Sequence, residues 1–168
     1  AMIEKWHSKH PNSKVDVLVR KGNEGLLENN PKINQLLIWD KKSDKYKNLF
    51  KILKTVRKEK YDLVINLQRY MASGILTAFS KGKETRGFSK NPLSFLFSKK
   101  FPHNIKKGIH EVDRNNSLIE DLTDSSRVSP KLYPSDEDFS IVKKYQEKPY
   151  VTMAPTSVWF TKQLPFEK

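Results

Sequence analysis

The sequence predicts an α/β fold built on a doubly wound, parallel, Rossmann-like sheet. Short runs of aliphatic and β-branched residues alternate along the chain with segments in which apolar residues recur at helical spacing. The run Val15–Arg20 (VDVLVR) is rich in β-branched residues, which suits a buried strand of a parallel sheet. Alternating strands and helices favour a parallel sheet, whose ligands bind beyond the carboxyl ends of its strands.

The first half of the chain contains the most regular elements. The segment Tyr46–Lys58 is expected to form a helix with lysines on one face and apolar residues on the other. The apolar face is formed by Leu49, Phe50, Leu53 and Val56. The other elements expected here are the strands Val15–Arg20, Ile33–Trp39, Tyr61–Leu67 and Thr85–Phe88, and the helix Met71–Phe79.

The second half is less regular. Ser135, followed three residues later by Asp138, is a capping-box signature for a helix that runs to about Glu147. Tyr150–Ala154 (YVTMA) predicts a strand that leads into a loop and a new helix at Pro165. Between the two halves we expect an irregular segment of aromatic residues and lysines, a helix and a linker, at Asn91–Gly108, Glu111–Leu122 and Asp124–Pro134.

Composition narrows the possible partners. Lys and Arg number 32 against 19 Asp and Glu, a net charge of +13, which favours an anionic partner such as nucleic acid, a phosphorylated sugar or a lipid surface. The absence of cysteine excludes a disulfide framework and thiol catalysis. No apolar run approaches the roughly 20 residues of a membrane span, so a cytoplasmic location is expected. The basic residues between Lys41 and Lys60 form either a solvated helix face or one that rests on an anionic membrane.

The histidines do not indicate a metal site. They lack metal-ligand spacing, so surface or capping roles are the better interpretation and no metal is expected. These residues are His7, His10, His103 and His110.

The stretch Ala154–Lys168 (APTSVWFTKQLPFEK) carries the strongest local signal. A strand that stops at small and hydroxyl residues and restarts as a helix offers free backbone N–H groups, hydroxyls and a lysine to a phosphate. An ordinary loop with a solvated lysine explains the same residues, and from the residues alone it is the favoured alternative because no glycine-rich phosphate motif is present.

This stretch resembles glycosyltransferase family nine, the ADP-heptose heptosyltransferases. Thr156, Ser157, Trp159, Lys162 and Pro165 match the family pattern, while Leu164 replaces the usual Trp. The resemblance implies that Thr156, Ser157 and Lys162 contact the diphosphate of the ADP-sugar donor.

Two further stretches are similar to the same family. Tyr61–Phe88 resembles its strand, turn, helix and Arg-Ile-Gly-Phe strand, with Asn66 where Asp is usual and Arg69 where Gly is usual. His110–Leu122 resembles its His-Ala-Val-Glu-Arg helix, although a plain helix N-terminus with a local carboxylate–arginine pair is the favoured interpretation of that stretch alone. The resemblance implies that five residues meet the acceptor: Gln68, Arg69, Arg86, His110 and Arg114.

The resemblance also implies a domain organisation. The chain corresponds to half of a two-domain GT-B glycosyltransferase whose first strand is missing. Residues 1–134 are expected to be a truncated acceptor-side Rossmann-like domain, and residues 135–168 the linker helix and first strand and loop of the donor-binding domain. The catalytic base is expected before Ala1, so no residue of this chain is named for it, and the chain alone is expected to be inactive.

The implied activity is transfer of heptose from ADP-heptose to an inner-core acceptor of lipopolysaccharide, with inversion. The expected partners are this nucleotide-sugar donor and an anionic lipopolysaccharide precursor, with no cofactor or metal and with peripheral contact at the inner membrane as an open alternative. Two other functions remain open: a basic module that binds nucleic acid or anionic surfaces, and a GT-B transferase that uses another nucleotide sugar.

Overall fold

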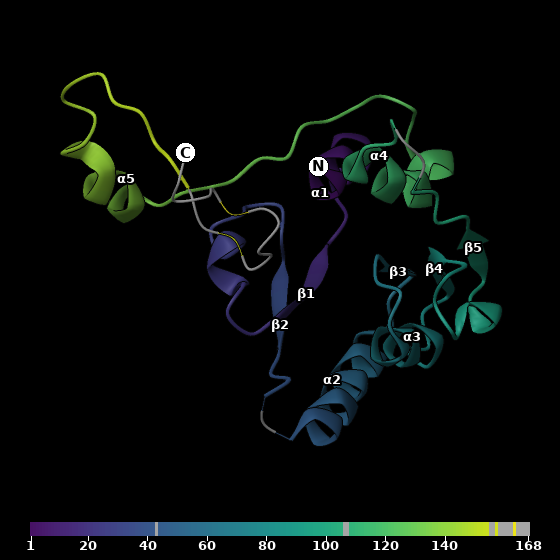
Figure 1. Ribbon diagram of the computed structural model, residues 1–168. Coiled ribbons are helices and arrows are strands. Elements are labelled where there is room, and N and C mark those ends of the chain that lie inside the picture. The colour runs from purple at the N-terminus through teal and green to yellow at the C-terminus, as the bar shows by residue number, and fades with distance from the viewer. Residues whose placement is uncertain (43, 106–107, 155–156, 158–162, 164–168) are drawn as a thin grey trace. The chain divides into compact units, whose positions relative to one another are not determined.

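The computed structural model describes residues 1–42, 44–105, 108–154, 157 and 163 (Figure 1). The chain divides into two compact units, Ala1–Tyr133 and Pro134–Lys168. All of the strands described lie in the first unit, which also holds the residues predicted to meet the acceptor.

The strands of the first unit are parallel, as the sequence predicts, but they form two sheets. In one sheet β1 (Asp16–Arg20) pairs with β2 (Gln35–Trp39). In the other the order is β3 (Leu63–Asn66), β4 (Glu84–Phe88) and β5 (Lys99–Phe101). Among the described residues β1 and β3 therefore each have one strand neighbour, as expected for a Rossmann-like sheet that lacks a strand between them.

A hydrogen bond joins the starts of β1 and β3. The Tyr61 hydroxyl donates to the Asp16 carboxylate at 2.5 Å. The bond links the two sheets within the first unit.

Two helices cover both sheets and form the main apolar core. The helix α2 (Lys45–Glu59) packs against β2 and against α3 (Met71–Ala78), which in turn packs against β3 and β4 (Figure 1). The buried cluster consists of Trp39, Leu49, Ile52, Leu53, Val56 and Leu76.

One residue predicted for this core lies outside it. Phe50 is 63% exposed, and Ile52, which was not named from the sequence, is buried in the core instead of Phe50. At about 100° per residue, Phe50 lies about 110° from the centre of the face formed by Leu49, Ile52, Leu53 and Val56. The expectation for Phe50 was therefore wrong.

The remaining helical segments of the first unit lie before β1, between strands or after β5. They are α1 (Met2–Lys9), the 3-10 turns η1 (Glu24–Leu26) and η2 (Ser94–Leu96), α4 (Glu111–Asn116) and the 3-10 segment η3 (Ser117–Leu122). The single helix expected at Glu111–Leu122 is thus two segments. The strand β5 was not predicted, because its three residues (KKF) carry no apolar pattern and it is defined by pairing with β4.

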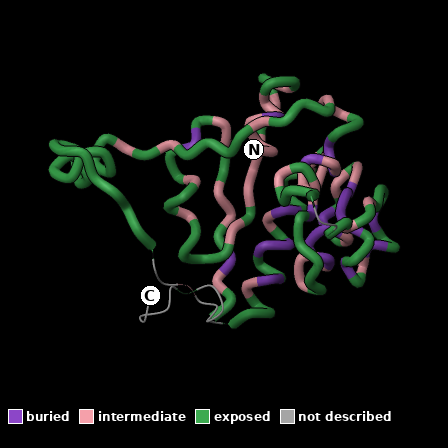
Figure 2. The backbone as a smooth tube through the Cα atoms, turned by 45° about the horizontal axis from the view of Figure 1, so that its top comes forward, coloured by how far each residue is buried: buried purple, intermediate pink, exposed green. Residues whose placement is uncertain are grey.

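The second unit contains α5 (Asp136–Lys143), whose predicted capping box is confirmed. The Ser135 hydroxyl accepts from the backbone N–H of Asp138, and the Asp138 carboxylate accepts from that of Ser135. The strand predicted at Tyr150–Ala154 is wrong, because these residues have no strand partner among the described residues and are exposed throughout (Figure 2). No helix in the described part of the chain is both long and apolar enough to cross a bilayer.

Candidate functional site

Basic side chains follow the carboxyl ends of three neighbouring strands. Arg69 follows β3, Lys90 follows β4 and His103 follows β5. Arg114 of α4 completes the group, which we call the basic cluster. Arg69, Lys90 and His103 share one edge of the sheet, because β3, β4 and β5 are parallel neighbours. Burial, and then the charges of Arg114, Lys90 and Arg69, lower the pKa of the His103 imidazole.

Two buried asparagines fix the loop that carries Gln68 and Arg69. The Asn91 amide donates to the carbonyl oxygens of Gln68 at 3.0 Å and Tyr70 at 3.1 Å. The side-chain oxygen Oδ1 of Asn66 accepts from the Gln68 backbone N–H at 2.8 Å. Since both asparagines are buried, the two exposed side chains of Gln68 and Arg69 start from a rigid backbone.

Several buried polar atoms near the strand ends have no hydrogen-bond partner among the described residues. They include His103 Nδ1, Arg114 Nε and Asn66 Nδ2. The His103 ring is held edge-on against Phe88, with ring centroids 4.8 Å apart. Because buried polar groups in folded proteins are normally paired, donors left open at the end of a sheet are candidates for ligand contacts.

Arg114 also has a local partner. Its guanidinium pairs with the Glu111 carboxylate one turn earlier, while the ring nitrogen Nδ1 of His110 accepts from the Val112 backbone N–H at 3.1 Å and caps α4. The stretch alone favoured a helix N-terminus with such a pair, and the structure shows one. Arg114 nonetheless keeps its unpartnered Nε, whereas His110 is an exposed cap.

Arg86 is separate from the basic cluster. Its side chain is 1% exposed, and its Nε donates to Glu84 at 2.7 Å, its Nη1 to the Leu118 carbonyl at 3.0 Å and its Nη2 to Asp121 at 3.1 Å. Hydrogen bonds from Arg86 and Lys99 lower the pKa of Asp121 to about 2. This geometry gives Arg86 a structural role, and its contact with an acceptor stays a prediction that rests on the resemblance alone.

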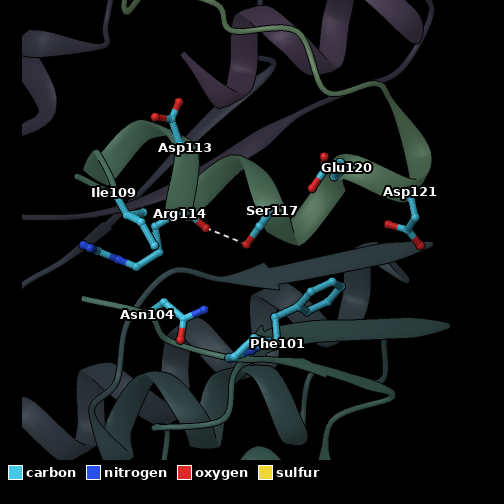
Figure 3. A pocket seen from close by; sticks show the side chains of 9 residues that line it. Phe101, Asn104, Ile109, Asp113, Arg114, Ser117, Glu120 and Asp121 are labelled. Carbon is cyan, nitrogen blue, oxygen red and sulfur yellow. Dashed lines mark hydrogen bonds between the residues drawn. The ribbon is translucent and has the colours of Figure 1, made fainter. Parts of the chain in front are cut away.

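A cavity of about 560 Å³ lies beside the cluster, between the end of β5 and the α4–η3 segment (Figure 3). Arg114 and Ser117 project from one wall, and Phe101 and Asn104 lie on the other. Three carboxylates also line the cavity, which makes it unsuited to an anion except near Arg114. They are Asp113, Glu120 and Asp121. Within the described ranges, no group of three or more metal-binding side chains is found.

The residues predicted to contact the donor are only partly described. Thr156 and Lys162 lie outside the described residues, and Ser157 accepts a hydrogen bond at its carbonyl oxygen from the Gln163 amide at 2.6 Å. Their contact with a diphosphate stays a prediction.

Two members of the cluster, Lys90 and His103, were missed from the sequence. His103 was interpreted as a surface or capping histidine, and Lys90 carried no motif. Both lie two residues beyond the end of a strand. Recognising β5 would have placed His103 at the carboxyl edge of the sheet. The sequence of β5 is short and basic, however, and does not resemble a strand.

Protonation of His103 should make the stability of the first unit depend on pH. Burial lowers the pKa of His103, and the charges of Arg114, Lys90 and Arg69 lower it further, outweighing nearby Glu111. The unfolded chain titrates near its ordinary value of about 6.5, so below that pH it binds more protons than the folded chain and stability falls. We expect urea unfolding to show a larger loss between about pH 8 and about pH 5 for the wild type than for His103→Gln.

His110→Asn is the matched control, because it removes an exposed histidine while keeping a cap acceptor. Equal slopes for wild type and His103→Gln would contradict the prediction.

Fold and site together define a Rossmann-like α/β protein with positive charge at the carboxyl ends of its strands. The chain belongs to glycosyltransferase family 9 (heptosyltransferase), which matches residues 49–168. The resemblance found in the sequence is thereby confirmed.

Curated relatives agree with this family. The chain is 30% identical over 127 residues to lipopolysaccharide heptosyltransferase 3 of Escherichia coli (strain K12), covering 72% of the chain and 37% of the relative. A second E. coli lipopolysaccharide heptosyltransferase 3 is 31% identical over 128 residues and is covered to the same 37%. The chain therefore spans little more than a third of the length of these relatives.

Solved structures share the fold. The glycosyl transferase family 9 protein from Veillonella parvula DSM 2008 superposes with a TM-score of 0.82 at 20% identity, over 98% of this chain and 51% of that one. E. coli ADP-heptose lps heptosyltransferase II superposes with a TM-score of 0.63 at 15% identity, over 86% of this chain and 45% of that one. These likenesses confirm the predicted fold, half of a GT-B glycosyltransferase.

Proposed function

We propose that the chain is the acceptor-side part of a glycosyltransferase that moves heptose from ADP-heptose to an inner-core acceptor of lipopolysaccharide, with inversion at the anomeric carbon. The names of its relatives support heptose as the transferred sugar and lipopolysaccharide as the acceptor. The observation that carries the proposal is the basic cluster at the carboxyl ends of β3, β4 and β5, because a lipopolysaccharide precursor is anionic.

The cluster would hold the acceptor rather than perform the chemistry. Arg114 and Lys90 bind acidic groups of the acceptor by charge-assisted hydrogen bonds, and the rigid Gln68–Arg69 loop orients the sugar. The reacting hydroxyl must lose a proton to a base, which we assign to no residue of this chain.

The leaving diphosphate would be bound by Thr156, Ser157 and Lys162. A lysine and hydroxyl donors stabilise the negative charge that develops on the leaving group without a metal or cofactor. In this proposal the acceptor binds to the first unit and the donor binds to the loop of the second. The reaction takes place in the cytoplasm, where nucleotide sugars are available.

Calorimetric titration of a lipopolysaccharide inner-core oligosaccharide into the chain tests the acceptor assignment. Arg114→Ala should weaken binding about tenfold or more, because it removes a charged partner from a half-buried site. Lys83→Ala is the matched control, since Lys83 lies at the amino end of β4 in an exposed pair with Asp62. Equal affinities for the two variants would refute the assignment.

A second titration separates the transferase from the binding module. ADP-heptose should bind the full-length protein about tenfold more weakly after Lys162→Ala. If the wild type binds neither sugar ligand and retains salt-dependent affinity for nucleic acid, the chain is a basic binding module instead.

A further inference from the structure

One face of α2 is unusually basic and carries two exposed aromatic rings. At about 100° per residue, the four lysines of this face fall within one narrow row opposite the buried side of the helix, and the two rings lie together on one side of that row. We call this surface the α2 outer face. It consists of Tyr46, Lys47, Phe50, Lys51, Lys54 and Lys58.

The packing of α2 fixes this face outward. Leu49, Ile52, Leu53 and Val56 are buried in the main core, so the helix cannot rotate without exposing them. The Tyr46 side chain is 69% exposed and Phe50 is 63% exposed. The two rings therefore form an exposed apolar patch directly beside the lysine row.

The lysines of this face are not neutralised within the described chain. Each is exposed, and none forms an ion pair with a carboxylate among the residues that the structure describes. The nearest charge interaction is that of neighbouring Lys45, whose ammonium lies 5.4 Å from the Tyr46 ring centroid. The face therefore presents uncompensated positive charge.

We propose that the α2 outer face docks on an anionic lipid bilayer. Negatively charged headgroups complement the lysine row, and the long lysine stems let the ammonium groups reach the headgroups while the helix lies flat. Tyr46 and Phe50, side by side on one flank, insert at the boundary between headgroups and acyl chains, as aromatic residues of interfacial helices do.

The shape of the face favours a bilayer over nucleic acid. Proteins that bind single strands use a charged groove with aromatic platforms for stacked bases. The α2 outer face is instead the convex side of one helix, and the exposed Arg57 lies beside it on the flank that carries the two rings. The lack of a groove disfavours single-stranded nucleic acid. The proposal is independent of the acceptor and donor assigned above.

Vesicle flotation tests the charge. The chain should bind vesicles with about 30% phosphatidylglycerol in phosphatidylcholine, and pure phosphatidylcholine at least about tenfold more weakly. Lys51→Glu/Lys54→Glu should lower binding to the anionic vesicles about tenfold or more. Lys14→Glu/Lys81→Glu changes the net charge equally at exposed lysines outside α2 and should have under about a twofold effect. Equal losses for the two pairs would reject a specific face.

The aromatic pair distinguishes a bilayer from nucleic acid. Tyr46→Ser/Phe50→Ser should lower vesicle binding about tenfold while leaving the affinity for a DNA duplex unchanged, because duplex binding depends on charge. Circular dichroism verifies that α2 remains folded. Unchanged vesicle binding, or a wild-type chain that binds DNA but not anionic vesicles, would overturn the proposal.

Discussion

Arg86→Ala should lower the free energy of unfolding of the first unit by about 3 kcal/mol, because it removes a fully buried side chain that pairs with two partly exposed carboxylates and satisfies the buried Leu118 carbonyl. The substitution removes the hydrogen bonds to Glu84, Asp121 and the Leu118 carbonyl and opens a cavity in the buried sheet. Urea unfolding followed by circular dichroism measures the change.

Lys83→Ala provides the contrast of an exposed ion pair. Lys83 and Asp62 are 79% and 83% exposed, and such pairs contribute about 0.5 kcal/mol or less. If Arg86→Ala were no more costly than Lys83→Ala, Arg86 would not be the structural anchor described above. Arg86→Lys should fall in between, because lysine keeps the charge but not the forked geometry.

Gly74→Ala should destabilise the first unit by about 2 kcal/mol, the cost of overpacking a filled interior. A Cβ at this position of α3 would collide with the Asn91 amide and lie 3.2 Å from the Leu93 Cβ. Asn91 would have to release the Gln68 and Tyr70 carbonyls, so binding at the neighbouring loop should weaken as well. Urea unfolding measures the stability change.

Gly25→Ala is the matched control for this substitution. A Cβ there meets nothing within 4 Å, so the change should be neutral or slightly stabilising. A similar loss for both variants would show that helix and turn propensity, rather than the Asn91 contact, decides the outcome.

The spacing of apolar residues along the sequence predicted those elements whose buried residues recur at regular intervals. The four apolar positions of α2 that face the core include three named from the sequence, while Phe50 was misplaced because pattern alone does not fix the width of the buried face. The strand β5 could not be predicted, since Lys99–Phe101 is a strand only through its pairing with β4. The error at Tyr150–Ala154 is the converse, a β-branched run without a partner.

The site was predicted less completely than the fold. Arg69 and Arg114 were named through the family resemblance, and their charges lower the pKa of the same histidine, His103. His103 follows β5, a strand that the sequence did not predict, and Lys90 follows the predicted β4 but carried no motif. The burial of Arg86 depends on Asp121, which lies 35 residues away, and no local pattern reveals such a pairing.

The Tyr61–Asp16 hydrogen bond links the two sheets and limits the distance between these two residues. Apolar contacts bring surfaces together without a fixed direction, whereas a hydrogen bond requires a particular donor–acceptor distance and angle. Burial and the bond to Asp16 raise the pKa of Tyr61, so the phenol keeps its proton throughout the physiological range. Ionisation of the phenol therefore does not break this link between the two sheets at physiological pH.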